Sequence, residues 1–183
     1  INVSLVKIQR DEKKYWWQCS KFKEEILLTG NQKLATLSLS PDGKKLAYIK
    51  ARGDLYLYDL ESKKEKKIVS SWNSPDYDWS PDSLWLSYSI EDENYNNDVW
   101  IVPVDGHRPP CNVSRHPDYD GSPSFSPDGK YLVFTSKRYD DTYDICYIHL
   151  NKESEENTSR DRLITEALKL MESGRPAKKE VSL

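Results

Sequence analysis

The feature that most limits the possible folds is a tight-turn sequence that occurs three times. Ser-Pro-Asp is followed by Gly, Ser and Gly at Ser40–Gly43, Ser80–Ser83 and Ser126–Gly129, and the turn prolines are 40 and 46 residues apart (Pro41, Pro81, Pro127). Pro presets the first corner of such a turn, Asp bonds the local backbone, and Gly accepts a positive φ. Ser83 replaces Gly, so we expect its turn to be strained or of another type. The repeat predicts an array of similar units.

Apolar positions around the turns recur in register. In each copy one apolar residue precedes the turn, two apolar residues follow it, and an Asp then begins a further apolar run. These positions are Leu39, Leu46, Tyr48 and Asp54 in the first copy, Trp79, Leu86, Tyr88 and Asp98 in the second, and Phe125, Leu132, Phe134 and Asp144 in the third. Each run is short, rich in β-branched or aromatic residues and bounded by turn formers, which is typical of β-strands. The three Asp side chains are expected to bond loop backbone at the start of a strand.

One copy supplies four antiparallel strands, and four-stranded units of about 40 to 45 residues are blades of a β-propeller. We therefore predict an all-β fold, a partial β-propeller of about three and a half blades with one C-terminal helix. The predicted units are the last three strands of a preceding blade (1–30), two blades (31–72 and 73–118), three strands of a further blade (119–150), and a linker, amphipathic helix and interdomain tail (151–183). The N-terminal strands are expected at Val3–Gln9, Lys14–Cys19 and Glu24–Leu28, and the helix at Ser159–Ser173, docked by its Leu and Ile side chains.

Three and a half blades do not close a propeller, since closed ones have about 4 to 8. The sheets at the two ends of the array would remain uncovered, so we expect the remaining blades to come from the parent chain or from other subunits. The sequence opens on Ile1 rather than Met and has no signal peptide, which we interpret as the edge of a longer protein.

Composition argues against several classes of function. The 27 basic and 30 acidic residues give a net charge of −3, unlike the basic excess of a nucleic-acid binder. No apolar run approaches the roughly 18 residues of a membrane span. The three Cys are far apart and form no Cys-x-x-Cys pair, which excludes a zinc knuckle or redox motif. Aromatic residues make up 11% of the chain, which predicts a hydrophobic core rich in aromatic side chains.

The repeat has a family resemblance. The Ser-Pro-Asp-Gly turn, the Lys45–Tyr48 run after it and the Asp-led strand resemble the β-propeller repeat of TolB-type and tricorn-protease-type proteins over about residues 30–150. Asp76–Asp82 also resembles propellers of the prolyl oligopeptidase and dipeptidyl peptidase group. Asn112–Pro117 and the charged helix resemble the interblade and post-blade segments of bacterial tricorn-like proteases. The resemblance implies a parent with PDZ and serine peptidase domains, the latter of the C-terminal-processing type.

We find no catalytic set in the sequence. A Gly-x-Ser-x-Gly elbow, a Gly-rich phosphate loop and a His-Glu-x-x-His zinc motif are all missing, and no cofactor is expected. Acidic clusters at Glu91–Asn94 and Asp140–Asp144 lack the spacing of a calcium-binding loop. We interpret both clusters as solvated loops rather than metal sites.

One face is predicted to gather aromatic and basic side chains, because loops joining second and third strands share an end of the sheets with loops between blades. We call it the loop surface. Its predicted binding residues are Arg52, Trp72, Tyr95, Arg115, His116, Arg138 and Tyr139, with Tyr77 and Tyr119 beside them. Aromatic residues and Arg are enriched at interface hot spots. Alternatively, Trp72 and Tyr77 wedge between blades. Arg138 is expected to be free to pair a partner's carboxylate, outside the core.

These features predict a non-catalytic β-propeller segment of a larger tricorn-like serine protease that binds or gates a peptide or protein substrate. Two alternatives stay open. One is a TolB-like protein-interaction propeller in the periplasm with no enzyme attached, and the other is a metal-dependent propeller enzyme of the lactonase or lyase kind. The expected partner is a protein or peptide in an extracytoplasmic bacterial compartment, with no nucleic acid and no membrane span.

Overall fold

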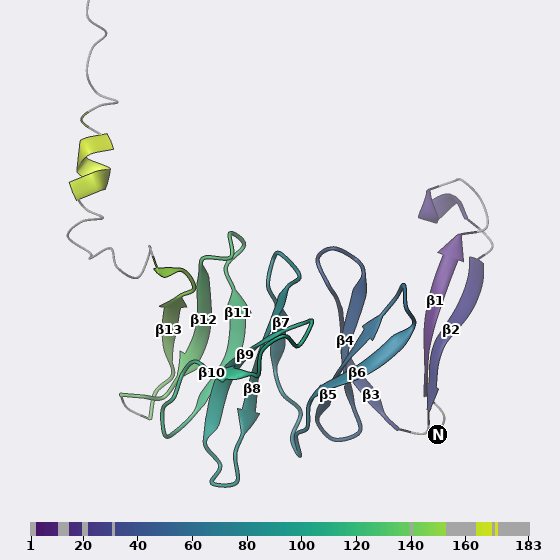
Figure 1. Cartoon of the computed structure of the whole chain (residues 1–183), viewed down its shortest axis with the longest axis horizontal. Helices are drawn as coiled ribbons and strands as arrows, with labels where there is room; N and C mark the ends of the chain where they lie inside the picture. Colours follow the sequence, from purple (N-terminus) through teal and green to yellow (C-terminus); the bar gives the residue numbers. More distant parts are fainter. Residues whose placement is uncertain are drawn as a thin grey trace, which may run out of the picture.

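The computed structural model describes residues 3–10, 15–19, 22–30, 32–139, 141–152, 164–169 and 171. Within them, thirteen strands form four antiparallel sheets that stand side by side in chain order (Figure 1). The N-terminal sheet has two strands, β1 (Val3–Arg10) and β2 (Phe22–Gly30). Blade 1 has four, β3 (Leu34–Leu39), β4 (Lys45–Lys50), β5 (Asp54–Asp59) and β6 (Lys64–Val69), and blade 2 has four, β7 (Tyr77–Trp79), β8 (Trp85–Glu91), β9 (Asn97–Pro103) and β10 (Cys111–Asn112). Blade 3 has three, β11 (Asp120–Phe125), β12 (Tyr131–Ser136) and β13 (Asp144–His149). The predicted fold class, a nearly all-β partial propeller, is confirmed.

The N-terminal sheet differs from the prediction. The segment expected as its middle strand contains a 3-10 turn, η1 (Trp16–Gln18), and β1 pairs directly with β2. The cause is local, because Gln18 closes hydrogen bonds on Tyr15: the Gln18 N–H donates to the Tyr15 carbonyl at 2.8 Å, and the Gln18 side-chain oxygen accepts from the Tyr15 N–H at 3.2 Å. The chain therefore turns back where a third strand was expected.

Residues 164–169 and 171 are helical and lie within the predicted helix. Its apolar face is not docked as expected, because the side chains of Ile164, Leu168 and Met171 are 49%, 55% and 69% exposed. The other residues of the predicted helix lie outside the described residues.

The same hydrogen-bonded turn joins the first and second strands of blades 1, 2 and 3. The hydroxyls of Ser40, Ser80 and Ser126 donate to the carboxylates of Asp42, Asp82 and Asp128 at 2.6, 2.5 and 2.6 Å. Each hydroxyl oxygen also accepts the N–H that opens the next strand, from Lys45, Trp85 or Tyr131, at 2.9 Å. The Ser hydroxyl, followed by the N–H of the next Lys, lowers the pKa of both Asp42 and Asp128. This network ties each turn to the strand after it.

The Ser83 turn has the same backbone conformation as the other two. Its φ is +63°, beside +71° at Gly43 and +69° at Gly129. A residue with a Cβ is disfavoured in this left-handed region by about 1–2 kcal/mol, so the turn of blade 2 is the strained one. The hydroxyl of Ser83 compensates by accepting the Asp42 N–H of the neighbouring blade at 3.0 Å.

The Asp that opens the third strand of a blade caps the end of its fourth strand. Asp54 accepts the Ser70 hydroxyl at 3.0 Å and the Ser71 N–H at 3.2 Å. Asp98 accepts the Ser114 hydroxyl at 3.0 Å and the His116 N–H at 3.4 Å. The expectation that these carboxylates bond loop backbone is confirmed for both blades.

The core lies between the sheets. Alternate residues of β4 face opposite neighbours: Leu46 and Tyr48 pack toward the N-terminal sheet, whereas Ala47 and Ile49 pack toward blade 2. A third cluster, around Val99, Leu132 and Phe134, fills the space between blades 2 and 3. Burial on both faces explains why the strands read as continuous apolar runs.

Polar bonds between neighbouring first strands add to this packing. The Trp79 indole N–H donates to the Ser38 hydroxyl at 3.0 Å, which joins blade 2 to blade 1. On the other side, the Asp78 carboxylate accepts the Ser124 hydroxyl at 3.0 Å and the Phe125 N–H at 2.9 Å, which joins blade 2 to blade 3. Strand β7 is thereby fixed between β3 and β11.

Gly53 permits the β4–β5 turn to touch the loop after β6. A Cβ on Gly53 would lie 1.9 Å from the Asn73 carbonyl oxygen. We predict that Gly53→Ala lowers the free energy of unfolding by about 1–3 kcal/mol, as overpacking does, measured by urea denaturation. The matched control is Gly30→Ala, because a Cβ there would meet nothing closer than the Gln32 N at 4.0 Å. Equal destabilisation by both variants would contradict this role of Gly53.

Candidate functional site

The loop surface contains one exposed aromatic pair at the junction of blades 1 and 2. The rings of Trp72 and Tyr95 meet edge to face with centroids 6.2 Å apart, and they are 52% and 76% exposed. Trp72 follows β6 and Tyr95 lies in the β8–β9 loop, so the pair comes from two blades. The structure thus brings together two of the predicted binding residues.

Ordered loops hold this pair in place. The Asp92 carboxylate accepts the N–H groups of Asn94 and Asn96 at 2.7 and 2.9 Å, which closes the loop around Tyr95. Next to Trp72, the Asn73 amide donates to the Glu91 carboxylate at 3.2 Å. These hydrogen bonds hold the two loops that carry the aromatic side chains.

The two tyrosines beside the predicted set have structural contacts. The Tyr77 hydroxyl lies within hydrogen-bonding reach of the Thr36 and Ala47 carbonyls in blade 1, either of which can accept its single proton, and burial raises the pKa of Tyr77. The wedge interpretation is therefore correct for Tyr77, whereas Trp72 is exposed. Tyr119 packs edge-on against Tyr143 with ring centroids 5.5 Å apart, and burial raises the pKa of Tyr119.

Arg138 is not the free guanidinium that we expected. Its Nη2 lies 3.1 Å from the carboxylate of Asp120 and donates to the Ser114 carbonyl at 3.1 Å, while Nε donates to the Ser136 hydroxyl at 3.2 Å. Asp120 is fully buried. A buried carboxylate needs a paired cation, so Arg138 serves the fold at the junction of blades 2 and 3.

The remaining predicted residues divide by exposure. Arg115 is exposed, and its Nε donates to the Asn112 carbonyl at 3.0 Å. His116 is half-buried, and its ring Nδ1 has no partner among the described residues. Arg52 and Tyr139 are exposed, each in a loop between the second and third strands of its blade. Of these four, Arg52 is next to Gly53, which lies against the backbone of Ser71 and Asn73 on either side of Trp72.

Two further observations concern the described residues. No group of three His, Cys, Asp or Glu side chains among them is placed to hold a metal ion. The helical residues included in the structure form no segment that is both long and apolar enough to cross a membrane.

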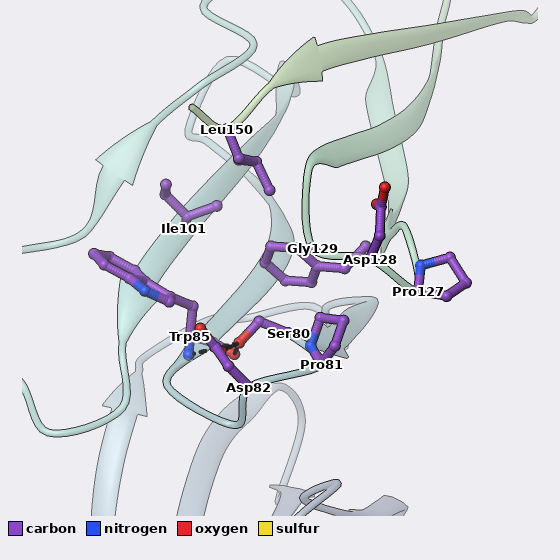
Figure 2. Close-up of a pocket in the computed structure, with 10 residues that line it drawn as sticks. Ser80, Pro81, Asp82, Trp85, Ile101, Pro127, Asp128, Gly129 and Leu150 are labelled. Carbon is purple, nitrogen blue, oxygen red and sulfur yellow. Dashed lines mark hydrogen bonds between the residues drawn. The ribbon is translucent and has the colours of Figure 1, made fainter. Parts of the chain in front are cut away.

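A cleft of about 460 Å³ lies on the opposite face, between the turns of blades 2 and 3 (Figure 2). Half-buried apolar side chains line it together with the two turns: Trp85, Ile101, Phe125, Leu150, Ser80, Pro81, Asp82, Pro127, Asp128 and Gly129. Sequence reasoning assigned this face only its turns and missed the cleft. The available signal was the smaller side chains of blade 3, Phe125 and Gly129, where blade 2 has Trp79 and Ser83.

Comparison with known proteins agrees with this architecture. The family model of the TolB beta propeller domain matches residues 6–161. A tricorn protease homolog from Saccharolobus solfataricus is 28% identical over 131 residues, covering 70% of this chain and 12% of that protein. The Tol-Pal system protein TolB of Bordetella pertussis is 27% identical over 117 residues, covering 62% of this chain and 27% of that protein. The crystal structure of the tricorn protease superposes with a TM-score of 0.64 at 17% identity, over 80% of this chain and 16% of that one. The chain spans well under a third of these relatives.

Arg138 and its neighbour Tyr139 provide a matched test of the corrected assignment. We predict that Arg138→Ala lowers the free energy of unfolding by about 3–5 kcal/mol, the usual effect of leaving a buried charge without its partner. Tyr139 is 78% exposed, so Tyr139→Ala should change it by less than about 0.5 kcal/mol. Denaturant unfolding of both variants measures the difference. Similar stabilities for the two variants would show that the Asp120 contact does not support the fold.

Proposed function

The chain belongs to the TolB β-propeller domain family, and from this membership we propose that it is a non-catalytic propeller segment of a larger tricorn-like serine protease. In this role it binds or gates a peptide or protein substrate through the loop surface. The relatives support the parent assignment, because a tricorn protease homolog matches 70% of the chain. The sequence supports the non-catalytic role, since no nucleophile motif is present in it.

The observation that carries the binding role is the Trp72–Tyr95 pair. Large rings are normally buried, because each removes a large apolar area from water. Here two rings from different blades are exposed by 52% and 76% while ordered loops fix their positions. Exposed aromatic side chains held in fixed positions are typical of binding hot spots.

The apolar end sheets support the proposal that further blades complete the propeller. On the N-terminal sheet, Ile8 and Ile26 are 62% and 64% exposed, and on blade 3, Ile145 and Tyr147 are 79% and 56% exposed. Between neighbouring blades, equivalent faces are buried in the core clusters. An adjoining blade on each end sheet would bury these side chains in the same way.

A second candidate is a TolB-like interaction propeller without an attached peptidase. The similarity to the Tol-Pal system protein TolB over 117 residues favours it. This candidate uses the same exposed aromatic pair, but its ligand is a folded protein surface rather than an unfolded polypeptide. The two candidates therefore differ in the kind of chain that binds.

Fluorescence anisotropy with labelled β-casein, a natively unfolded polypeptide, tests the first candidate. We predict that replacing Trp72 and Tyr95 together by Ala weakens binding by about 1–3 kcal/mol, a typical hot-spot effect. The matched control is the double Ala variant of Tyr15 and Trp17, which are stacked and 63% and 62% exposed on the N-terminal side. Casein should remain uncut in all samples.

Two outcomes would contradict the proposal. Equal loss of casein binding in the two double variants would show non-specific adhesion to exposed rings. Binding that is unchanged by the loss of Trp72 and Tyr95 would place the binding surface elsewhere. No casein binding by the unmodified chain would favour the second candidate.

A further inference from the structure

The interface between blades 1 and 2 and the interface between blade 2 and the three-stranded blade 3 are built from equivalent residues but are not packed alike. Between blades 1 and 2, the apolar side chains near the turns are buried: Leu57, Trp79 and Val104 are 4%, 6% and 7% exposed. Their equivalents between blades 2 and 3 are only half-buried and line the 460 Å³ cleft: Ile101, Phe125 and Leu150. One interface is closed at the turn face and the other is open.

The fourth residue of the turn explains much of the difference. At the closed interface the Ser83 hydroxyl oxygen accepts the Asp42 N–H at 3.0 Å and joins the two turns. At the open interface Gly129 stands in place of Ser83 and has no side chain. The equivalent N–H, that of Asp82, has no acceptor among the described residues, and a Cβ on Gly129 would meet nothing within 4 Å.

The walls of the cleft determine which chemistry it accepts. Ile101 and Leu150 come from different blades and meet in one apolar cluster with Phe125. Figure 2 shows the side chains of Ile101 and Leu150 near each other above the turns. The Trp85 ring packs edge-on against His107, with centroids 6.0 Å apart, which steadies one wall. The volume falls within the roughly 300–1,000 Å³ of small-ligand sites.

The rim of the cleft is acidic. Asp82 and Asp128 each use one carboxylate oxygen, Oδ1, inside their own turn. Oδ2 of Asp82 has no partner in the part of the chain that the structure describes, whereas Oδ2 of Asp128 lies 3.7 Å from Lys130 Nζ. Two carboxylates with one ammonium group leave negative charge beside an apolar floor, which favours a cationic ligand with apolar surface.

We propose that this cleft binds a peptide segment in which an apolar side chain lies between basic residues. The apolar side chain packs against Ile101, Phe125 and Leu150. A peptide carbonyl oxygen accepts the Asp82 N–H, in the position that the Ser83 hydroxyl takes at the closed interface. The basic side chains pair with the carboxylates of Asp82 and Asp128. This site is on the face opposite the loop surface, so it stands or falls independently of the function proposed above.

Three fluorophore-labelled peptides test the ligand class by anisotropy. The first is acetyl-Lys-Lys-Leu-Lys-Lys-amide, the second has Gly in place of Leu, and the third has Glu in place of every Lys. We expect the Leu peptide with Lys to bind at least about tenfold more tightly than either of the others, which corresponds to about 1.4 kcal/mol. Equal affinity for the Gly peptide, or no binding of the first peptide, would overturn the proposal.

Gly129→Ser tests the location, because Ser in this position restores the side chain of the closed interface. We expect it to weaken binding of the Leu peptide by about tenfold or more. Gly43→Ser is the matched control, since Gly43 has the same positive φ and the same open surroundings; it should leave the affinity within about twofold. Equal affinity of the Gly129→Ser and unmodified chains would overturn the proposal.

Backbone chemical-shift mapping on the unmodified chain provides a test that needs no variant to fold. Titration with the Leu peptide should shift the amide signals of Asp82, Trp85 and Gly129. Shifts centred on Trp72 and Tyr95 instead would place the peptide on the loop surface and overturn the proposal for the cleft.

Discussion

A Ser hydroxyl held between an Asp carboxylate and the N–H that opens the next strand organises the turn in all three blades. In all three blades the hydroxyl donates to the carboxylate at 2.5–2.6 Å and accepts the N–H at 2.9 Å. Because the hydrogen bonds have the same geometry in each turn, the first two strands of each of these blades have the same relative orientation. Similar blades can then stack face to face, and a propeller is such a stack.

Stacking in turn determines where binding residues can lie. Side chains of the inner strands point alternately into two interfaces, so β4, β5, β8 and β9 contain no exposed residue, and Ala47 and Leu55 are fully buried. Beside these inner strands, exposed groups lie in the loops and turns at the strand ends. One end carries ordered loops with the Trp72–Tyr95 pair, and the other carries the turns and the cleft. Each proposed site uses one of these ends.

Sequence reasoning succeeded where the determining interaction is local or repeats from blade to blade. The turns involve residues close in the chain, and the Asp54 and Asp98 caps, which reach partners 16 to 18 residues away, lie in a pattern that repeats. It failed for Arg138, because the need for a cation arises from the full burial of Asp120, which is a property of the folded structure and not of the local sequence. It also failed for the cleft, which follows from a volume difference between equivalent interface positions. The expected third N-terminal strand failed for another reason, since the hydrogen bonds between Tyr15 and Gln18 compete with the sheet.

The two interfaces differ at several equivalent positions, and the hydrogen bond between neighbouring turns differs at one of them, Ser83 against Gly129. Residue-resolved amide hydrogen exchange measures this hydrogen bond, because protection reports hydrogen bonding of individual N–H groups. We expect similar protection for the N–H groups of Lys45, Trp85 and Tyr131, which bond equivalent Ser hydroxyls. We also expect the Asp42 N–H, which bonds the Ser83 hydroxyl, to exchange about tenfold or more slowly than the Asp82 N–H, although both follow Pro in the same turn. Equal exchange at Asp42 and Asp82 would show that the Ser83 hydroxyl does not join the two turns.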